Sequence, residues 1–67
     1  MKLFGQLISG AAFTVTDTWS RDDLDLATVY VKVDEQRARP GNWHEGRWVA
    51  GTLPHVRFGQ NHPVVVA

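Results

Sequence analysis

The feature that most constrains this chain is that its 67 residues include no cysteine. Disulfide bonds and zinc sites built on thiolates are therefore excluded. A chain this short buries only about 60% of the surface that its unfolded form exposes, so it needs stabilisation from dense packing or self-association. Three Trp, three Phe and one Tyr favour dense packing, because each large ring buries roughly 150–250 Å². We expect a single domain, residues 1–67, that packs around aromatic side chains and self-associates.

The clearest local pattern is Thr-Val-Tyr-Val-Lys-Val at residues 28–33. β-Branched residues that alternate with other types are typical of a strand with one buried face. The pattern predicts that Val29, Val31 and Val33 form the buried face. The strand has room to extend through Asp34 and Glu35.

A turn is predicted directly after this strand, at Arg39-Pro40-Gly41-Asn42. Proline presets φ at the second position of a type II turn, and glycine accepts the positive φ of the third. Residues 47–53 would then form a strand that returns against residues 28–33, with residues 43–46 inside the connection.

Other short segments also have strand character. Residues 12–16 and 55–58 alternate, and residues 64–66 are three valines. Ser20, with Asp23 three positions later, is typical of a helix start, so one short helical turn is expected near residues 20–26. The pattern predicts an all-β, or mainly β, fold: a small barrel or a curled antiparallel sheet of about five to six short strands. The remaining strand candidate is residues 3–8.

The charges are unevenly distributed, although seven basic and seven acidic residues give a net charge of zero. Residues 1–35 carry a net −3 and residues 36–67 a net +3. We expect the two halves to pair within the sheet, because opposite charges on facing strands attract. The alternative is a basic face that binds a polyanion, although a dedicated nucleic-acid-binding protein usually has a basic excess.

Metal-binding motifs are incomplete in this sequence. A metalloprotease helix needs a second histidine three residues after the glutamate of His44-Glu45, and Trp48 stands there instead. The spacing of His44, His55 and His62 matches no metal site. Asp22, Asp23 and Asp25 lack the central glycine and distal glutamate of a calcium loop. We expect no metal and no cofactor.

Catalytic motifs are absent as well. Neither Ser9 nor Ser20 lies in a nucleophile elbow, and no glycine-rich loop could cradle a phosphate. A monomer of this size has little room to enclose a substrate pocket. We therefore predict that the protein is not an enzyme. An active site between subunits, around His44, His55 or His62, is the alternative.

The most suggestive cluster combines aromatic and basic residues in the second half of the chain. Trp48 and Phe58 are expected in the core, while Trp43, beside the predicted turn, is expected at the surface. Trp, Tyr and Arg dominate the energetics of protein interfaces, and bases also stack on aromatic rings beside arginines. We predict a protein–protein interface, with single-stranded nucleic acid as the alternative ligand. The predicted binding residues are Trp43, Arg47, Arg39, His44 and Arg57.

Composition also bears on location and source. No segment approaches the roughly 20 apolar residues of a membrane helix. Gly5, Gln6 and Ser9 interrupt the apolar start, so no signal peptide is expected. The absence of cysteine fits a reducing compartment, and we expect a cytoplasmic protein. Five Arg against two Lys favour a bacterial or phage source. These features suit an accessory or inhibitory subunit, and the terminal strand 64–66 would close a barrel or add to a neighbour's sheet.

Overall fold

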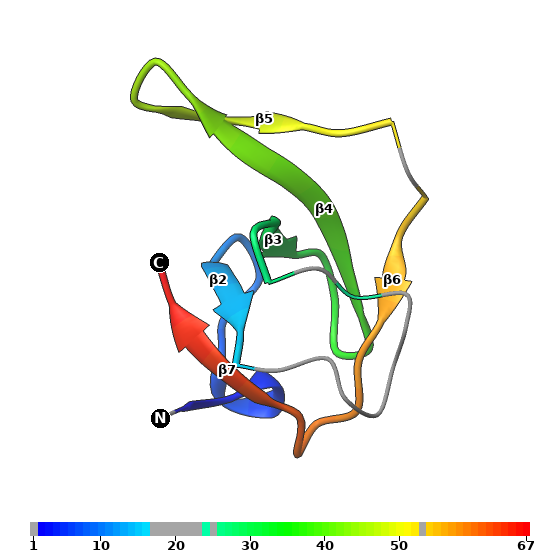
Figure 1. Ribbon diagram of the computed structural model, residues 1–67. Helices are drawn as coiled ribbons and strands as arrows, with labels where there is room; N and C mark the ends of the chain where they lie inside the picture. Colours follow the sequence, from blue (N-terminus) through cyan, green and yellow to red (C-terminus); the bar gives the residue numbers. More distant parts are fainter. Residues whose placement is uncertain (1, 17–23, 25, 53) are drawn as a thin grey trace.

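The described part of the computed structural model consists of short strands and one 3-10 helix (Figure 1). The structure describes residues 2–16, 24, 26–52 and 54–67. The elements are β1 (Lys2–Leu3), the 3-10 helix η1 (Phe4–Gln6), β2 (Ala12–Val15), β3 (Val29–Lys32), β4 (Arg37–His44), β5 (Arg47–Ala50), β6 (Val56–Arg57) and β7 (Pro63–Val66).

The strands form one antiparallel sheet in the order β1-β7-β2-β3-β4-β5, and β6 also pairs with β4. The predicted all-β class is therefore confirmed, with seven strands in the described part of the chain. The sheet curls but does not close into a barrel, so β1 lies at one edge, and β5 and β6 lie beside β4 at the other (Figure 1). β7 inserts between β1 and β2, so the terminal valines complete the sheet from within.

Four aromatic rings form the centre of the core on one face of this sheet. Phe4, Phe13, Tyr30 and Phe58 are each at most 3% exposed. Their neighbouring ring centroids lie 5.1–5.6 Å apart, in stacked and edge-to-face pairs. Such pairs contribute about 0.5–1.5 kcal/mol each beyond the area they bury. The predicted core position of Phe58 is confirmed. Around the rings pack Leu7, Val15, Leu24, Ala38 and Val64.

The prediction of one buried face on β3 is only partly right, because the strand is covered on both sides: Val29 is buried as expected, at 7% exposure, and so are residues on the other side. Tyr30 and Lys32 point into the core, whereas Val33 is 39% exposed. Tyr30 pairs with Phe13 across the sheet and stacks on its ring. The ammonium of Lys32 donates hydrogen bonds to the Phe4 carbonyl at 3.0 Å and the Leu7 carbonyl at 2.6 Å. It also lies 4.6 Å from the Phe4 ring centroid, so the charge is buried with partners, as it must be.

The turn predicted at residues 39–42 is wrong, because β4 runs through it from Arg37 to His44. The hydrogen bond from Gly51 N–H to the Pro40 carbonyl, at 2.9 Å, shows that Pro40 directs its backbone away from β3. On that side β5 ends at Ala50, and β6 pairs only with the start of β4. The missing proline N–H therefore falls between two short partner strands, where it interrupts little of the ladder.

The actual turns lie on either side of β4. After β3, the Asp34 carboxylate accepts hydrogen bonds at 2.9 Å from the N–H groups of Gln36 and Arg37. The chain therefore reverses at residues 33–37, and β3 does not continue through Glu35. After β4, the chain reverses at Glu45 and Gly46.

Three other predicted elements differ from the structure. Of the strand predicted at residues 3–8, only Leu3 lies in a strand, β1, and η1 follows it. The strand predicted at residues 47–53 stops at residue 50, and it pairs with β4 rather than with β3. The helical turn expected near residues 20–26 falls mainly on residues that the structure does not describe.

Candidate protein-binding face

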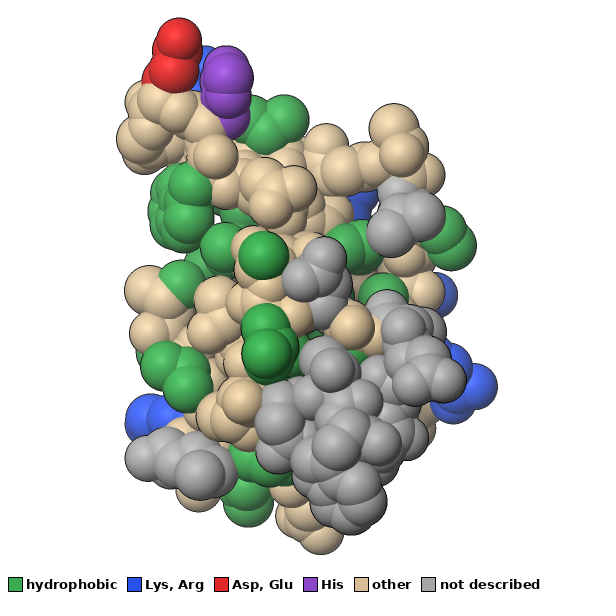
Figure 2. Space-filling view, in the orientation of Figure 1, with side chains coloured by type: hydrophobic (Ala, Val, Ile, Leu, Met, Phe, Trp, Pro, Cys, Tyr) green, Lys and Arg blue, Asp and Glu red, His purple; other side chains and the backbone are tan. Residues whose placement is uncertain are grey.

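The β4–β5 hairpin extends from the rest of the sheet and carries most of the predicted binding residues (Figure 1). His44 pairs with Arg47, so its loop contains only Glu45 and Gly46. Their φ values are +52° and +82°. Positive φ at both loop residues defines a type I′ turn, whose twist matches that of the two strands. The tip is a two-residue reversal of the chain, and charged and histidine side chains gather on it (Figure 2).

Trp43 and Trp48 lie directly opposite each other on this hairpin. The hydrogen bond between residues 51 and 40 fixes the alternation of the ladder, which makes the tryptophan pair a non-hydrogen-bonded one. Side chains approach most closely in such pairs. The two indoles therefore lie on the same surface of the hairpin.

Trp48 lies across Gly41, which is buried beneath it. A Cβ atom at position 41 would come within 2.6 Å of two carbons of the Trp48 indole. The indole N–H donates a 2.8 Å hydrogen bond to the Val29 carbonyl. Trp48 thus spans β5, β4 and β3 and stays half-buried outside the core cluster. The prediction that Trp48 lies in the core is wrong, because the absence of a side chain at Gly41 leaves room for the indole on the other side of the sheet.

Trp43 is 53% exposed, which confirms its predicted position at the surface. Side chains that pair across an antiparallel ladder share a face, and alternate residues along a strand do so too. These two rules place Trp43 on the side of the sheet opposite the aromatic rings. We call this side the outer face, defined by Val29, Val31, Arg39, Gly41, Trp43, Trp48 and Ala50.

The predicted binding residues do not form a single cluster. Arg39 is exposed on the outer face, two positions along β4 from Gly41. His44 and Arg47 alternate with the two tryptophans, so they point to the other side of the hairpin tip. Arg57 pairs with Arg37 near the far end of β4, about 20 Å from Trp43 at 3.3 Å per residue. Of the predicted binding residues, the outer face therefore carries Trp43 and Arg39 near the hairpin. His44 and Arg47 point away from this face, and Arg57 is distant from Trp43.

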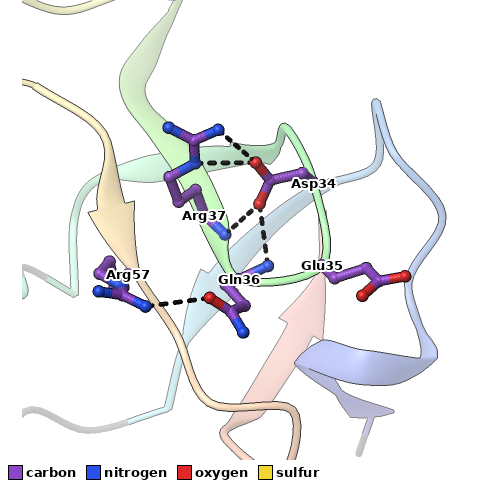
Figure 3. Close-up of a pocket in the computed structure, with 5 residues that line it drawn as sticks. All are labelled: Asp34, Glu35, Gln36, Arg37 and Arg57. Atoms are coloured by element: carbon purple, nitrogen blue, oxygen red, sulfur yellow. Dashed lines mark hydrogen bonds and ion pairs between the residues drawn. The ribbon is translucent and has the colours of Figure 1, made fainter.

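A separate hollow lies at that far end, beside the turn after β3 (Figure 3). Arg37 forms a 2.6 Å ion pair with Asp34, and Arg57 donates a 3.0 Å hydrogen bond to the Gln36 side chain. The hydrogen bond from the Arg37 side chain lowers the pKa of Asp34 below 3.8, and the Gln36 N–H lowers it further. This ion pair joins the acidic and basic halves of the chain at their boundary. Glu35 completes the lining of the hollow.

Two parts of the outer face were missed from sequence. Gly41 and Val29 form the floor on which Trp48 rests, yet Gly41 was assigned to a turn and Val29 to the core-facing side. The spacing of Trp43 and Trp48 around a Glu-Gly dipeptide was the available signal, since X-Gly between two strands is typical of a two-residue hairpin. Over the described ranges, no group of three or more His, Asp or Glu side chains could hold a metal ion.

Comparisons with known protein families, with curated proteins and with solved structures found no match. Among the residues that the structure describes, no helix has the length and apolar character to cross a membrane.

Proposed function

We propose that this protein is a non-catalytic binding protein that acts through a protein–protein interface on its outer face, with Trp43 as the central contact. The observation that carries the proposal is that Trp43 is 53% exposed on a strand whose backbone is fixed by pairing with β5. Tryptophan and arginine are enriched among the residues that dominate binding energy. A binding residue on a paired strand loses less backbone entropy on binding than one on a free loop. Arg39 supplies a charged rim on the same face.

The test is Trp43→Ala, compared with Ile8→Ala. Ile8 is also a large exposed side chain, 79% exposed, but it precedes β2 and lies outside the hairpin. Partners are first captured from a host lysate, and the Kd of each is then measured by titration calorimetry with the pure chain. Trp43→Ala should weaken binding by at least about 2 kcal/mol, roughly thirty-fold in Kd. Ile8→Ala should leave Kd unchanged, and denaturant unfolding should show that both variants fold.

An unchanged Kd for Trp43→Ala in every complex would contradict the proposal. The self-association of the pure chain is measured beside it, by sedimentation equilibrium, so that a second copy is included among the partners tested. If Trp43→Ala does weaken binding, we propose that the protein is an accessory or inhibitory subunit of a larger partner, or a component of its own assembly.

Single-stranded nucleic acid is the second candidate, favoured by the position of Arg39 beside the tryptophan pair. Two indoles can stack with bases, and arginines beside them can follow the phosphates. The net charge of zero weighs against this candidate. A labelled oligonucleotide in fluorescence anisotropy tests it, since affinity must fall steeply with salt as counterions are released. Absence of binding at low salt would exclude it.

A further inference from the structure

The two edges of the sheet differ in how they are protected from pairing with another chain. β1 is only two residues long and begins with a lysine, Lys2. Short edge strands and edge lysines are devices that block such pairing. β5 has four residues, Arg-Trp-Val-Ala, without proline or lysine. Within the described residues, β5 pairs with β4 on one side, and no strand pairs with the other side of β5. Two of the edge strands, β1 and β6, have only two residues each, so β5 is the longest open edge strand among the described residues.

The open edge presents a defined set of backbone groups. Residues 42 and 49 form a hydrogen-bonded pair, by alternation from the bond between residues 51 and 40. Val49 therefore directs its N–H and carbonyl towards β4, whereas Trp48 and Ala50 direct theirs outwards. The edge thus offers two N–H donors and two carbonyl acceptors, spaced two residues apart.

We propose that this edge pairs with β5 of a second copy in an antiparallel, two-fold arrangement centred on Val49. In this register Trp48 lies opposite the partner's Ala50, and Ala50 lies opposite the partner's Trp48. All four outward groups of each strand then find partners across the axis. An antiparallel two-fold contact uses the same surface on both copies, which is the commonest symmetry of protein dimers.

Side chains fit the same register. Val49 is 46% exposed and meets the partner's Val49 at the axis. Arg47 lies opposite the partner's Gly51, so like charges do not face each other directly. The pairing joins two seven-stranded sheets and sets the two outer faces side by side, because residues opposite one another share a face. A second copy therefore fits every position of the edge without a clash of charge.

The small size of the chain gives an energetic reason for this dimer. A 67-residue chain is short of buried surface, and the exposed valine at the axis would become buried. The dimer does not use the Trp43 side chain, so this inference stands independently of the interface proposed above. If both hold, the dimer carries two binding faces, and its affinity for a repeated target would exceed that of one face.

The experiment places a charge at the axis. Val49→Lys puts two lysines opposite each other and should raise the dimer Kd at least ten-fold, measured by sedimentation equilibrium and native mass spectrometry. Val65→Lys is the matched control, because Val65 is 48% exposed in another strand, β7. It should dimerise like the parent chain. Ala50→Pro gives a second test, since it removes an outward N–H without removing a β4–β5 hydrogen bond.

Mixing Val49→Lys with Val49→Glu tests the register itself. Each variant alone should be monomeric, whereas the mixture should form a heterodimer through the opposite charges at the axis. Circular dichroism and denaturant unfolding establish that each variant is folded. A parent chain that stays monomeric up to about 1 mM would overturn the inference, and so would a dimer that Val49→Lys and Ala50→Pro leave intact. Loss of partner binding in Trp43→Ala with the dimer unchanged would support both proposals separately.

Discussion

Replacing Gly41 with alanine tests the arrangement on which the outer face depends. The new Cβ would overlap the Val49 carbonyl oxygen and lie 2.6 Å from the Trp48 ring. The carbonyl belongs to the paired strand β5, so it cannot turn away as a flexible side chain could. We expect the Trp48 indole to be displaced from Gly41 and the β4–β5 hydrogen bonds to break locally.

The expected cost follows from what Trp48 would lose. Its hydrogen bond to the Val29 carbonyl contributes about 1 kcal/mol. A half-buried indole covers on the order of 100 Å², or about 2.5 kcal/mol at 25 cal/mol per Å². Alanine returns about 0.4–1 kcal/mol by restricting the unfolded chain. The free energy of unfolding should therefore fall by about 2–3 kcal/mol, a large part of the stability of so small a domain.

Gly59→Ala is the matched control, because a Cβ there meets no atom within 4 Å. Both variants are compared with the parent chain by urea unfolding, followed by circular dichroism. Gly59→Ala should change the free energy of unfolding by less than about 1 kcal/mol. If Gly41→Ala were as stable as Gly59→Ala, the indole would not rest on Gly41, and the outer face as described here would be wrong.

Three further predictions concern single residues. Glu45→Asn should stabilise the protein to unfolding by about 0.5–1 kcal/mol, because asparagine tolerates the φ of +52° better than glutamate does; equal stability would contradict the strain. Lys32→Met should lower the free energy of unfolding by about 2 kcal/mol, since two carbonyls lose a charged donor and only part of this is offset by removing a buried charge. The lowered pKa of Asp34 contributes stability at neutral pH that is lost as the pH falls below 3.8. Thermal unfolding of Asp34→Asn should therefore depend less on pH between 4 and 2 than that of the parent chain, and parallel curves would refute this.

Several strands could be predicted from sequence because their signal is local. Residues 12–16, 28–33, 55–58 and 64–66 each contain a strand close to the expected place. Alternation and β-branched residues are properties of the segment itself, so they indicate a strand whichever strand it pairs with. The all-β class followed from these segments alone.

The facing of β3 could not be read from the same pattern. Tyr30 and Lys32 have apolar parts as well as polar ends, so either side of the strand could be buried. The choice depends on partners far along the chain: the Phe13 ring for Tyr30, and the carbonyls near η1 for Lys32. Hydrophobicity favoured the valines, of which Val29 is indeed buried, but packing and hydrogen bonding placed the two longer side chains in the aromatic core.

The course of β4 shows a similar limit. Pro40-Gly41 is a strong local turn signal, yet both residues are in the middle of the longest strand. Pro40 is tolerated because its missing N–H faces the interval between β5 and β6, and Gly41 is needed because Trp48 covers it. Both reasons involve residues that lie at least seven positions away. The exposed position of Trp43 was predicted, but its partnership with Trp48 depended on this unforeseen hairpin.

The distribution of apolar side chains links the fold to the proposed interfaces. A chain short of buried surface gains most by placing its largest side chains inside, yet both described tryptophans lie outside the core cluster. Trp43 and Val49 remain about half exposed on one hairpin, and a type I′ turn that places Glu45 at positive φ holds that hairpin in shape. Each of these features costs the isolated chain stability. A face and an edge that become buried on association would return that free energy, which is why both proposals place partners on the same hairpin.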